Sequence, residues 1–174
     1  MFVMGIDPGL SRCGYGVVTR VPGEGRAGMR AEAAGVITTP VEDPVPVRLA
    51  ALAAELHALL VEYTPTVVVV ERVLFQANAR TAMSVGQASG LALAAAAARG
   101  ADVVQYSPNE VKMAVTGYGA ASKEQVQRMV QSLLGLADRP RPPDAADALG
   151  LAIAHLAAAP MLARVAAHEG GGSR

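Results

Sequence analysis

The sequence predicts an α/β domain: a mixed sheet of about five strands with helices on both faces. Short runs rich in Val, Ile and Thr alternate with longer segments that have helical spacing. The first three strand-like runs follow one another directly, which predicts an antiparallel meander, whereas the later ones alternate with helices. Four consecutive valines at 67–70 are typical of a strand buried on both faces.

The first strand opens the chain and ends before Pro8, which cannot donate to a sheet ladder. Gly9 then allows a turn, and the short link through residues 11–13 predicts a hairpin with the second strand. The strands expected after the first cover residues 14–20, 29–38, 67–70 and 102–106.

Five helices are expected. Leu52, Leu56 and Leu60 recur at helical spacing, whereas three prolines at 39–46 predict a loop before them. Ser122 with a glutamine three residues later forms a capping-box pattern. The expected helices cover residues 47–63, 77–99, 108–116, 122–134 and 144–158.

Gly86 and Gly90 lie four residues apart in the second of these helices, so another backbone can approach that face closely. The pattern is compatible with two arrangements. The helix either packs tightly on its own sheet or forms the seam of a homodimer.

Composition places the chain among compact globular proteins, with 52% apolar residues and a mean hydropathy of +0.31. We expect one domain over 1–158 and a mobile C-terminal tail over 159–174. The single cysteine, Cys13, excludes an internal disulfide and a cysteine-built zinc site. No apolar run reaches the roughly 18 residues of a membrane span, and no signal peptide is apparent, so we expect no membrane partner and a cytoplasmic protein.

Overall charge argues weakly against a nucleic-acid partner, because 15 basic residues balance 15 acidic ones. However, 13 of the basic residues are arginines. Lys112 and Lys123 are the only lysines in the chain, and they lie close together in the sequence. Their retention is either chance or a sign of a specific role.

Four acidic residues recur in positions that suggest a site. Asp7 and Glu71 each follow a buried strand, and Asp144 and Asp147 lie three apart on one helix face. Asp7 alone is explained as a turn cap and Asp144 as a helix cap. Asp147, in contrast, interrupts an otherwise apolar run, where an unpaired carboxylate costs several kcal/mol unless a cation accompanies it.

Together these acids form a candidate metal site. Oxygen ligands without histidine favour magnesium or manganese over zinc. Two such ions suit hydrolysis of a phosphodiester, since one activates water and the other stabilises the leaving oxygen.

The chain resembles the RuvC family, which comprises bacterial Holliday junction resolvases with a ribonuclease-H-like fold. The resemblance runs from residue 2 to about 156, and its motifs are specific in combination. They are Gly-Ile-Asp-Pro-Gly at 5–9, Val-Glu-Arg-Val at 70–73, Gln-Ala-Ser-Gly at 87–90, Glu-Val-Lys at 110–112, Gly-Ala-Ala-Ser-Lys at 119–123 and Asp-Ala-Ala-Asp-Ala-Leu at 144–149.

This resemblance implies that the four acids are catalytic metal ligands for two Mg²⁺ or Mn²⁺ ions. It implies that Lys112 and Lys123 stabilise phosphates near the cut, which would explain why these two lysines are kept. It further implies a homodimer joined through the small-residue helix, a four-way DNA junction as substrate, and the RuvA–RuvB branch-migration complex as partner. Cleavage would leave 5′-phosphate and 3′-hydroxyl ends, as recombination and DNA repair require.

One departure concerns an aromatic residue that stacks on an unpaired base in many members of the family. Here Leu74 occupies that position and Phe75 follows it. Phe75 either takes over the stacking, worth roughly 1–3 kcal/mol, or lies in the core; Tyr118 is another candidate. The remaining DNA contacts that we expect are Arg72, Asn78 and Arg80.

Three other functions compete with this interpretation. A sugar-kinase-like ATPase also begins with a strand carrying Asp-x-Gly, but it needs a second lobe for which 174 residues leave no room. A related short resolvase-like family with RNA-processing roles is less compatible with the Asp144–Asp147 pair and both lysines. A non-catalytic junction-binding module would be favoured by a missing acid, yet all four are present.

Overall fold

The computed structural model describes residues 1–23, 27–73 and 79–170. A five-stranded sheet forms the centre, with strand order β3-β2-β1-β4-β5. The strands and helices, in chain order, are β1 (Phe2–Asp7), β2 (Arg12–Arg20), β3 (Met29–Thr38), α1 (Val45–Tyr63), β4 (Val67–Glu71), α2 (Ala79–Ala98), β5 (Asp102–Tyr106), α3 (Pro108–Thr116), α4 (Lys123–Leu134) and α5 (Pro143–Gly170).

The pairing of the strands confirms the predicted mixed sheet. β1 pairs with β2 and β2 with β3 in antiparallel register, whereas β1–β4 and β4–β5 are parallel. The edge strand β3 is mostly half-buried, which explains why its sequence lacks a clear alternating pattern.

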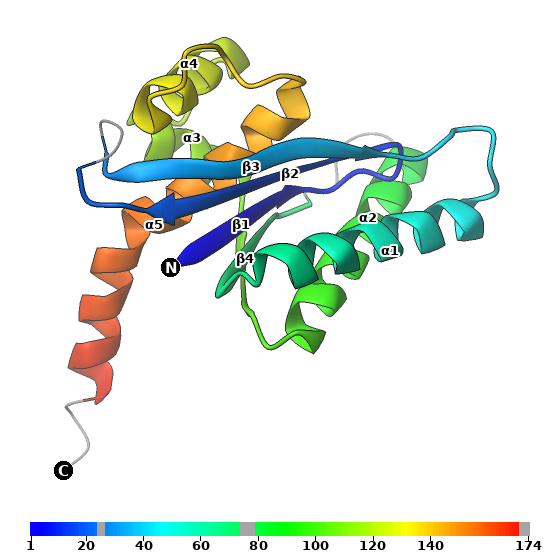
Figure 1. The fold of residues 1–174 in the computed structure, drawn as a ribbon, viewed down its shortest axis with the longest axis horizontal. Helices are drawn as coiled ribbons and strands as arrows, with labels where there is room; N and C mark the ends of the chain where they lie inside the picture. Colours follow the sequence, from blue (N-terminus) through cyan, green and yellow to red (C-terminus); the bar gives the residue numbers. More distant parts are fainter. Residues whose placement is uncertain (24–26, 74–78, 171–174) are drawn as a thin grey trace.

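Helices cover both faces of the sheet, as predicted (Figure 1). Alternate valines of β4 divide between two cores, since Val67 and Val69 pack with α3, α4 and α5. Val68 and Val70 pack on the opposite face with α1 and α2. Val67 is 6% exposed and the other three are fully buried, as expected for a central strand.

Two predicted helix bounds were wrong by more than one residue. α1 begins at Val45 rather than at residue 47, because a proline in the first turn needs no N–H donor and Pro46 is therefore tolerated. α5 does not end at residue 158 but continues to Gly170, through an alanine-rich stretch with high helix propensity that extends beyond the sheet (Figure 1). The predicted start of the second helix at 77 and 78 lies outside the described residues, and α2 ends at Ala98.

In the described part of the chain, no helix combines the length and apolar character that crossing a membrane requires.

Candidate active site

Two of the predicted acids come together because their strands are parallel neighbours. Ile6 of β1 pairs with Val70 of β4, so Asp7 and Glu71, one residue further along each strand, end side by side at the same sheet edge. Asp147 of α5 joins them. All three line a cavity of about 330 Å³. Its lining residues are Asp7, Glu71, Pro108, Val111, Lys112, Lys123, Val126, Asp147 and Leu151.

Three glycines of β1 and β2 bring α5 close enough to complete this site. A Cβ at Gly5 would overlap the carbonyl oxygen of Ala148, and a Cβ at Gly14 would overlap that of Asp144. A Cβ at Gly16 would lie 2.8 Å from the backbone nitrogen of Leu149. Because these positions have no side chain, the helix backbone rests directly on the strands. That contact places Asp144 and Asp147 beside Asp7.

Both lysines face the same cavity from two further helices. Lys112 lies on α3 and Lys123 is the first residue of α4. The Nζ atom of Lys123 lies 2.6 Å from Oδ2 of Asp147. The two lysines of the chain therefore line the same cavity as Asp7, Glu71 and Asp147.

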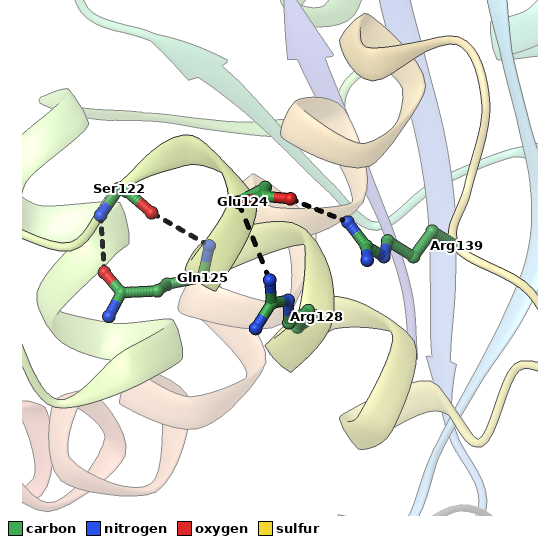
Figure 2. Close-up of polar contacts among 5 residues, drawn as sticks. All are labelled: Ser122, Glu124, Gln125, Arg128 and Arg139. Atoms are coloured by element: carbon green, nitrogen blue, oxygen red, sulfur yellow. Dashed lines mark hydrogen bonds and ion pairs between the residues drawn. The ribbon is translucent and has the colours of Figure 1, made fainter.

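A capping box fixes the start of α4, as the sequence predicted. The Ser122 hydroxyl accepts a hydrogen bond from the Gln125 backbone N–H, and the Gln125 side chain accepts one from the Ser122 N–H (Figure 2). Next to Lys123, Glu124 contacts Arg128 at 3.6 Å and Arg139 at 3.4 Å (Figure 2). These contacts tie the helix end that carries Lys123 to the segment leading into α5.

The carboxylates repel one another. Burial raises the pKa of Asp7 to about 7, with further contributions from the charges of Glu71, Asp147 and Asp144, while Lys123 opposes the rise. Burial and then the charge of Asp147 also raise the pKa of Glu71. An additional cation at this place would be strongly favoured.

Asp144 has a different environment from the other three. It does not line the cavity; its Oδ2 accepts hydrogen bonds from Arg12 Nε at 3.1 Å and Nη2 at 2.9 Å. Burial works to raise the pKa of Asp144, but the Arg12 hydrogen bond and charge outweigh it and lower the pKa. Its charge nevertheless acts on Asp7 and Lys123.

The donor set suits a hard divalent cation, since every candidate ligand is a carboxylate oxygen. In the described part of the chain, no three His, Cys, Asp or Glu side chains already stand close enough to hold one ion together. The Lys123 ammonium instead pairs with Asp147, and the surrounding acids raise its pKa although burial opposes this. Small side-chain rotations at the cavity would be needed to gather ligands around an ion.

The predicted DNA contacts fall into three groups. Leu74, Phe75 and Asn78 lie outside the described residues, and Arg80 is the second residue of α2. Arg72 follows β4, where it donates to the Gln105 carbonyl at 3.0 Å and lies 3.7 Å from Glu110. Tyr118 is 61% exposed in the turn between α3 and α4. Arg72 and Tyr118 are accessible to a ligand, and their role in DNA binding stays a prediction.

Sequence reasoning missed two arginines near the site. Arg12 could have been found only through its partner Asp144, which lies 132 residues away in the chain. Arg48 of α1 is 9% exposed and donates to the hydroxyls of Thr39 at 3.0 Å and Ser11 at 2.6 Å. A single arginine on a helix carries no sequence signal for such a buried role.

Comparison with known proteins bears on this geometry. A family model described as "Crossover junction endodeoxyribonuclease RuvC" matches residues 3–155. The RuvC protein of Frankia casuarinae is 48% identical over 174 residues, covering 99% of this chain and 98% of its own. That of Syntrophomonas wolfei is 48% identical over 156 residues, covering 90% and 88%.

Solved structures agree with this assignment. Thermus thermophilus RuvC has a TM-score of 0.84 and 39% identity, covering 92% of this chain and 96% of its own. The same protein in complex with a Holliday junction substrate has a TM-score of 0.85 and 38% identity, with the same coverage. These neighbours confirm the predicted ribonuclease-H-like fold. The chain therefore belongs to the RuvC family of crossover junction endodeoxyribonucleases.

Proposed function

We propose that this chain resolves Holliday junctions by hydrolysing one phosphodiester in each of two opposed strands. The observation that carries the proposal is the cavity in which Asp7, Glu71 and Asp147 meet Lys112 and Lys123. A relative at 38% identity has been solved with a Holliday junction substrate, which supports the choice of nucleic acid.

We assign metal binding to Asp7, Glu71, Asp144 and Asp147, with Mg²⁺ or Mn²⁺ as the ions and two ions per site. Mutual repulsion of the acids, expressed in the raised pKa values of Asp7 and Glu71, supports a cation there. Divalent ions held by these oxygens would polarise the phosphodiester and stabilise the charge that develops as it is cleaved.

The two lysines would serve the phosphates. Lys112 and Lys123 line the cavity beside the acids, and a lysine ammonium is a compact charge that suits a phosphate oxygen. When DNA and ions enter, Lys123 would exchange Asp147 for a phosphate oxygen near the scissile bond. That exchange keeps every charge in the cavity partnered.

Further contacts to the junction are proposed for Arg72, Asn78, Arg80 and Tyr118, with base stacking by Phe75 next to Leu74. The exposure of Tyr118 and the accessible end of Arg72, whose side chain is 50% exposed, support part of this set.

A homodimer would place two such sites on opposed strands. Among the described residues, none has an atom within 4 Å of a Cβ added at Gly86 or Gly90. The buried residues of α2 are instead Ala88, Ser89, Ala92 and Ala96. Of the two arrangements left open by the sequence, this favours a dimer seam. We also propose cooperation with the RuvA–RuvB complex, and action in the cytoplasm, where bacterial relatives keep their chromosome.

The proposal is tested by incubating the protein with a synthetic four-way junction and with a linear duplex of the same sequence, each with Mg²⁺ or Mn²⁺. We expect symmetrical nicks on the junction alone, lost with EDTA. Asp147→Asn should abolish cleavage while junction binding persists. Tight binding by the wild-type protein without cleavage under either metal would contradict a catalytic role, and cleavage of the duplex would contradict selectivity.

A further inference from the structure

Arg12 makes a two-donor contact with an acid of the site. It is the first residue of β2, and its Nε and Nη2 both donate to Oδ2 of Asp144, at 3.1 and 2.9 Å. An arginine fork on a carboxylate has a fixed geometry, unlike a single lysine contact. Here both donors share one oxygen, so the contact restrains Oδ2 of Asp144 more than a single hydrogen bond would.

The backbone on which Arg12 sits is itself anchored. In the preceding turn, Ser11 accepts a hydrogen bond from the buried Arg48, and the Thr39 hydroxyl donates to the Leu10 carbonyl at 2.5 Å. Thr39 also donates its backbone N–H to the Ser11 carbonyl at 3.3 Å. Arg12 thus starts from a turn held by buried groups, even though its own side chain is 49% exposed.

Asp144 lies apart from the other acids of the site. It lies in the first turn of α5, directly after a proline-rich segment, and it does not line the cavity. Arg12 does not line the cavity either, whereas Lys123 does. Arg12 therefore contacts Asp144 from outside the cavity and binds only one of its two carboxylate oxygens.

We propose that Arg12 is a positioning residue that holds the Asp144 carboxylate in the orientation needed for binding a divalent cation. The inference rests on the proposed role of Asp144 as a metal ligand. Hydrogen-bond partners of metal-binding carboxylates contribute to affinity because the ligand then loses less freedom when the ion binds. Their removal typically weakens metal binding by about 10–100-fold.

The structure offers a matched control. Arg30 of β3 contacts Glu32 in the same way, with Nε at 3.1 Å and Nη2 at 2.8 Å from one oxygen. The side chains of Arg30 and Glu32 are 49% and 23% exposed. Those of Arg12 and Asp144 are similarly exposed, at 49% and 26%. Arg30→Ala therefore removes a two-donor arginine–carboxylate contact of the same kind away from the acids, together with a further interaction of Arg30.

The experiment measures Mn²⁺ binding without DNA, as the rise in melting temperature across a Mn²⁺ titration. Arg12→Ala should raise the half-saturating Mn²⁺ concentration by about 10-fold or more. Arg12→Lys should recover part of that loss, and Arg30→Ala should match the wild type. Junction affinity in EDTA should be unchanged in all three variants, and melting without Mn²⁺ checks that each one folds.

Asp144→Asn and Asp147→Asn, run in parallel, separate this inference from the proposed function. If both weaken Mn²⁺ binding but Arg12→Ala does not, Arg12 has no positioning role. If neither weakens it, the metal-site assignment itself fails. A lower half-saturating concentration in Arg12→Ala would mean that Arg12 competes with the metal. Loss of junction affinity in Arg12→Ala with unchanged Mn²⁺ binding would make Arg12 a DNA contact. This result, like a lower half-saturating Mn²⁺ concentration, overturns the proposal.

Discussion

Asp7 has an environment that destabilises the protein when no cation is present. Its pKa is raised from 3.8 to about 7, so between these values the folded state binds more protons than the unfolded state. The stability contributed by this group is therefore full at low pH and is lost as the pH rises through 7. Neutralising Asp7 should remove this penalty.

We predict that Asp7→Asn melts higher than the wild type in EDTA at pH 8, because it removes a penalty of up to about 4 kcal/mol and 1 kcal/mol shifts the melting temperature of a domain this size by about 2–4 °C. At pH 4.5 the difference should largely disappear, because Asp7 is then protonated in the wild type. Thermal melts at the two pH values measure this. Glu42→Gln, an exposed acid in the loop before α1, is the control. A variant that melts lower at pH 8 would contradict the repulsion.

Lys123 is the second single residue for which we make a prediction. Its ammonium partners Asp147 at 2.6 Å, and the proposed function has it stabilise a phosphate during cleavage. We expect Lys123→Gln to lower kcat on a junction by about 10²–10³-fold, as for other lost transition-state contacts, with junction affinity changed only a few-fold. Arg128→Gln, further along α4 and 60% exposed, should cleave normally. A loss confined to affinity would assign Lys123 to binding alone.

Among the secondary-structure elements, the position of α5 depends on glycines. Gly14 pairs with Asp7 in the sheet and lies under the Asp144 backbone. A Cβ at Gly14 would lie 2.7 Å from the Asp144 carbonyl carbon, which is closer than such atoms approach one another. The neighbour is backbone, so it cannot move aside at low energetic cost.

We predict that Gly14→Ala shifts the start of α5, lowers stability by about 1–3 kcal/mol as overpacking does, and lowers cleavage further than the stability loss explains. Denaturant unfolding and junction cleavage measure the two effects. Gly119→Ala is the control, because a Cβ there meets nothing closer than 3.7 Å. Normal cleavage by Gly14→Ala would show that the acids do not require this close contact.

Sequence patterns were sufficient where a local rule decides the structure. The valines of β4, the Ser122 capping box and the acids that end β1 and β4 follow from periodicity and chain order. The resemblance to a family then linked the acids to the lysines. What could not be predicted depends on contacts between distant segments. Arg12 meets Asp144 only after β2 and α5 pack together, and the need for Gly14 arises from the same packing.

For the whole molecule, the proposed function depends on the coupling of two sites. Resolution requires two nicks in one junction, and the cavity of Asp7, Glu71 and Asp147 would make one of them. The face of α2 at Gly86 and Gly90 is exposed, and a Cβ added at either glycine meets no atom within 4 Å in the described part of the chain. That face is therefore available to a second copy.

We predict that Gly86→Glu yields a folded monomer that no longer makes paired cuts. The substitution favours the helix itself, since Gly costs about 1 kcal/mol relative to good helix formers, so any loss arises at the interface. Light scattering after gel filtration gives the mass. A supercoiled plasmid with an extruded cruciform separates paired cuts, which yield linear DNA, from single nicks, which yield open circles.

The control Ala51→Glu adds the same charge to an exposed position of α1 and should behave as the wild type. Open circles from a Gly86→Glu monomer would assign α2 to the dimer and show that each cavity cuts independently. Linear DNA from that monomer would mean that one chain makes both cuts. A wild-type monomer would remove the dimer from the proposal, because the exposed glycine face would then have no partner in solution.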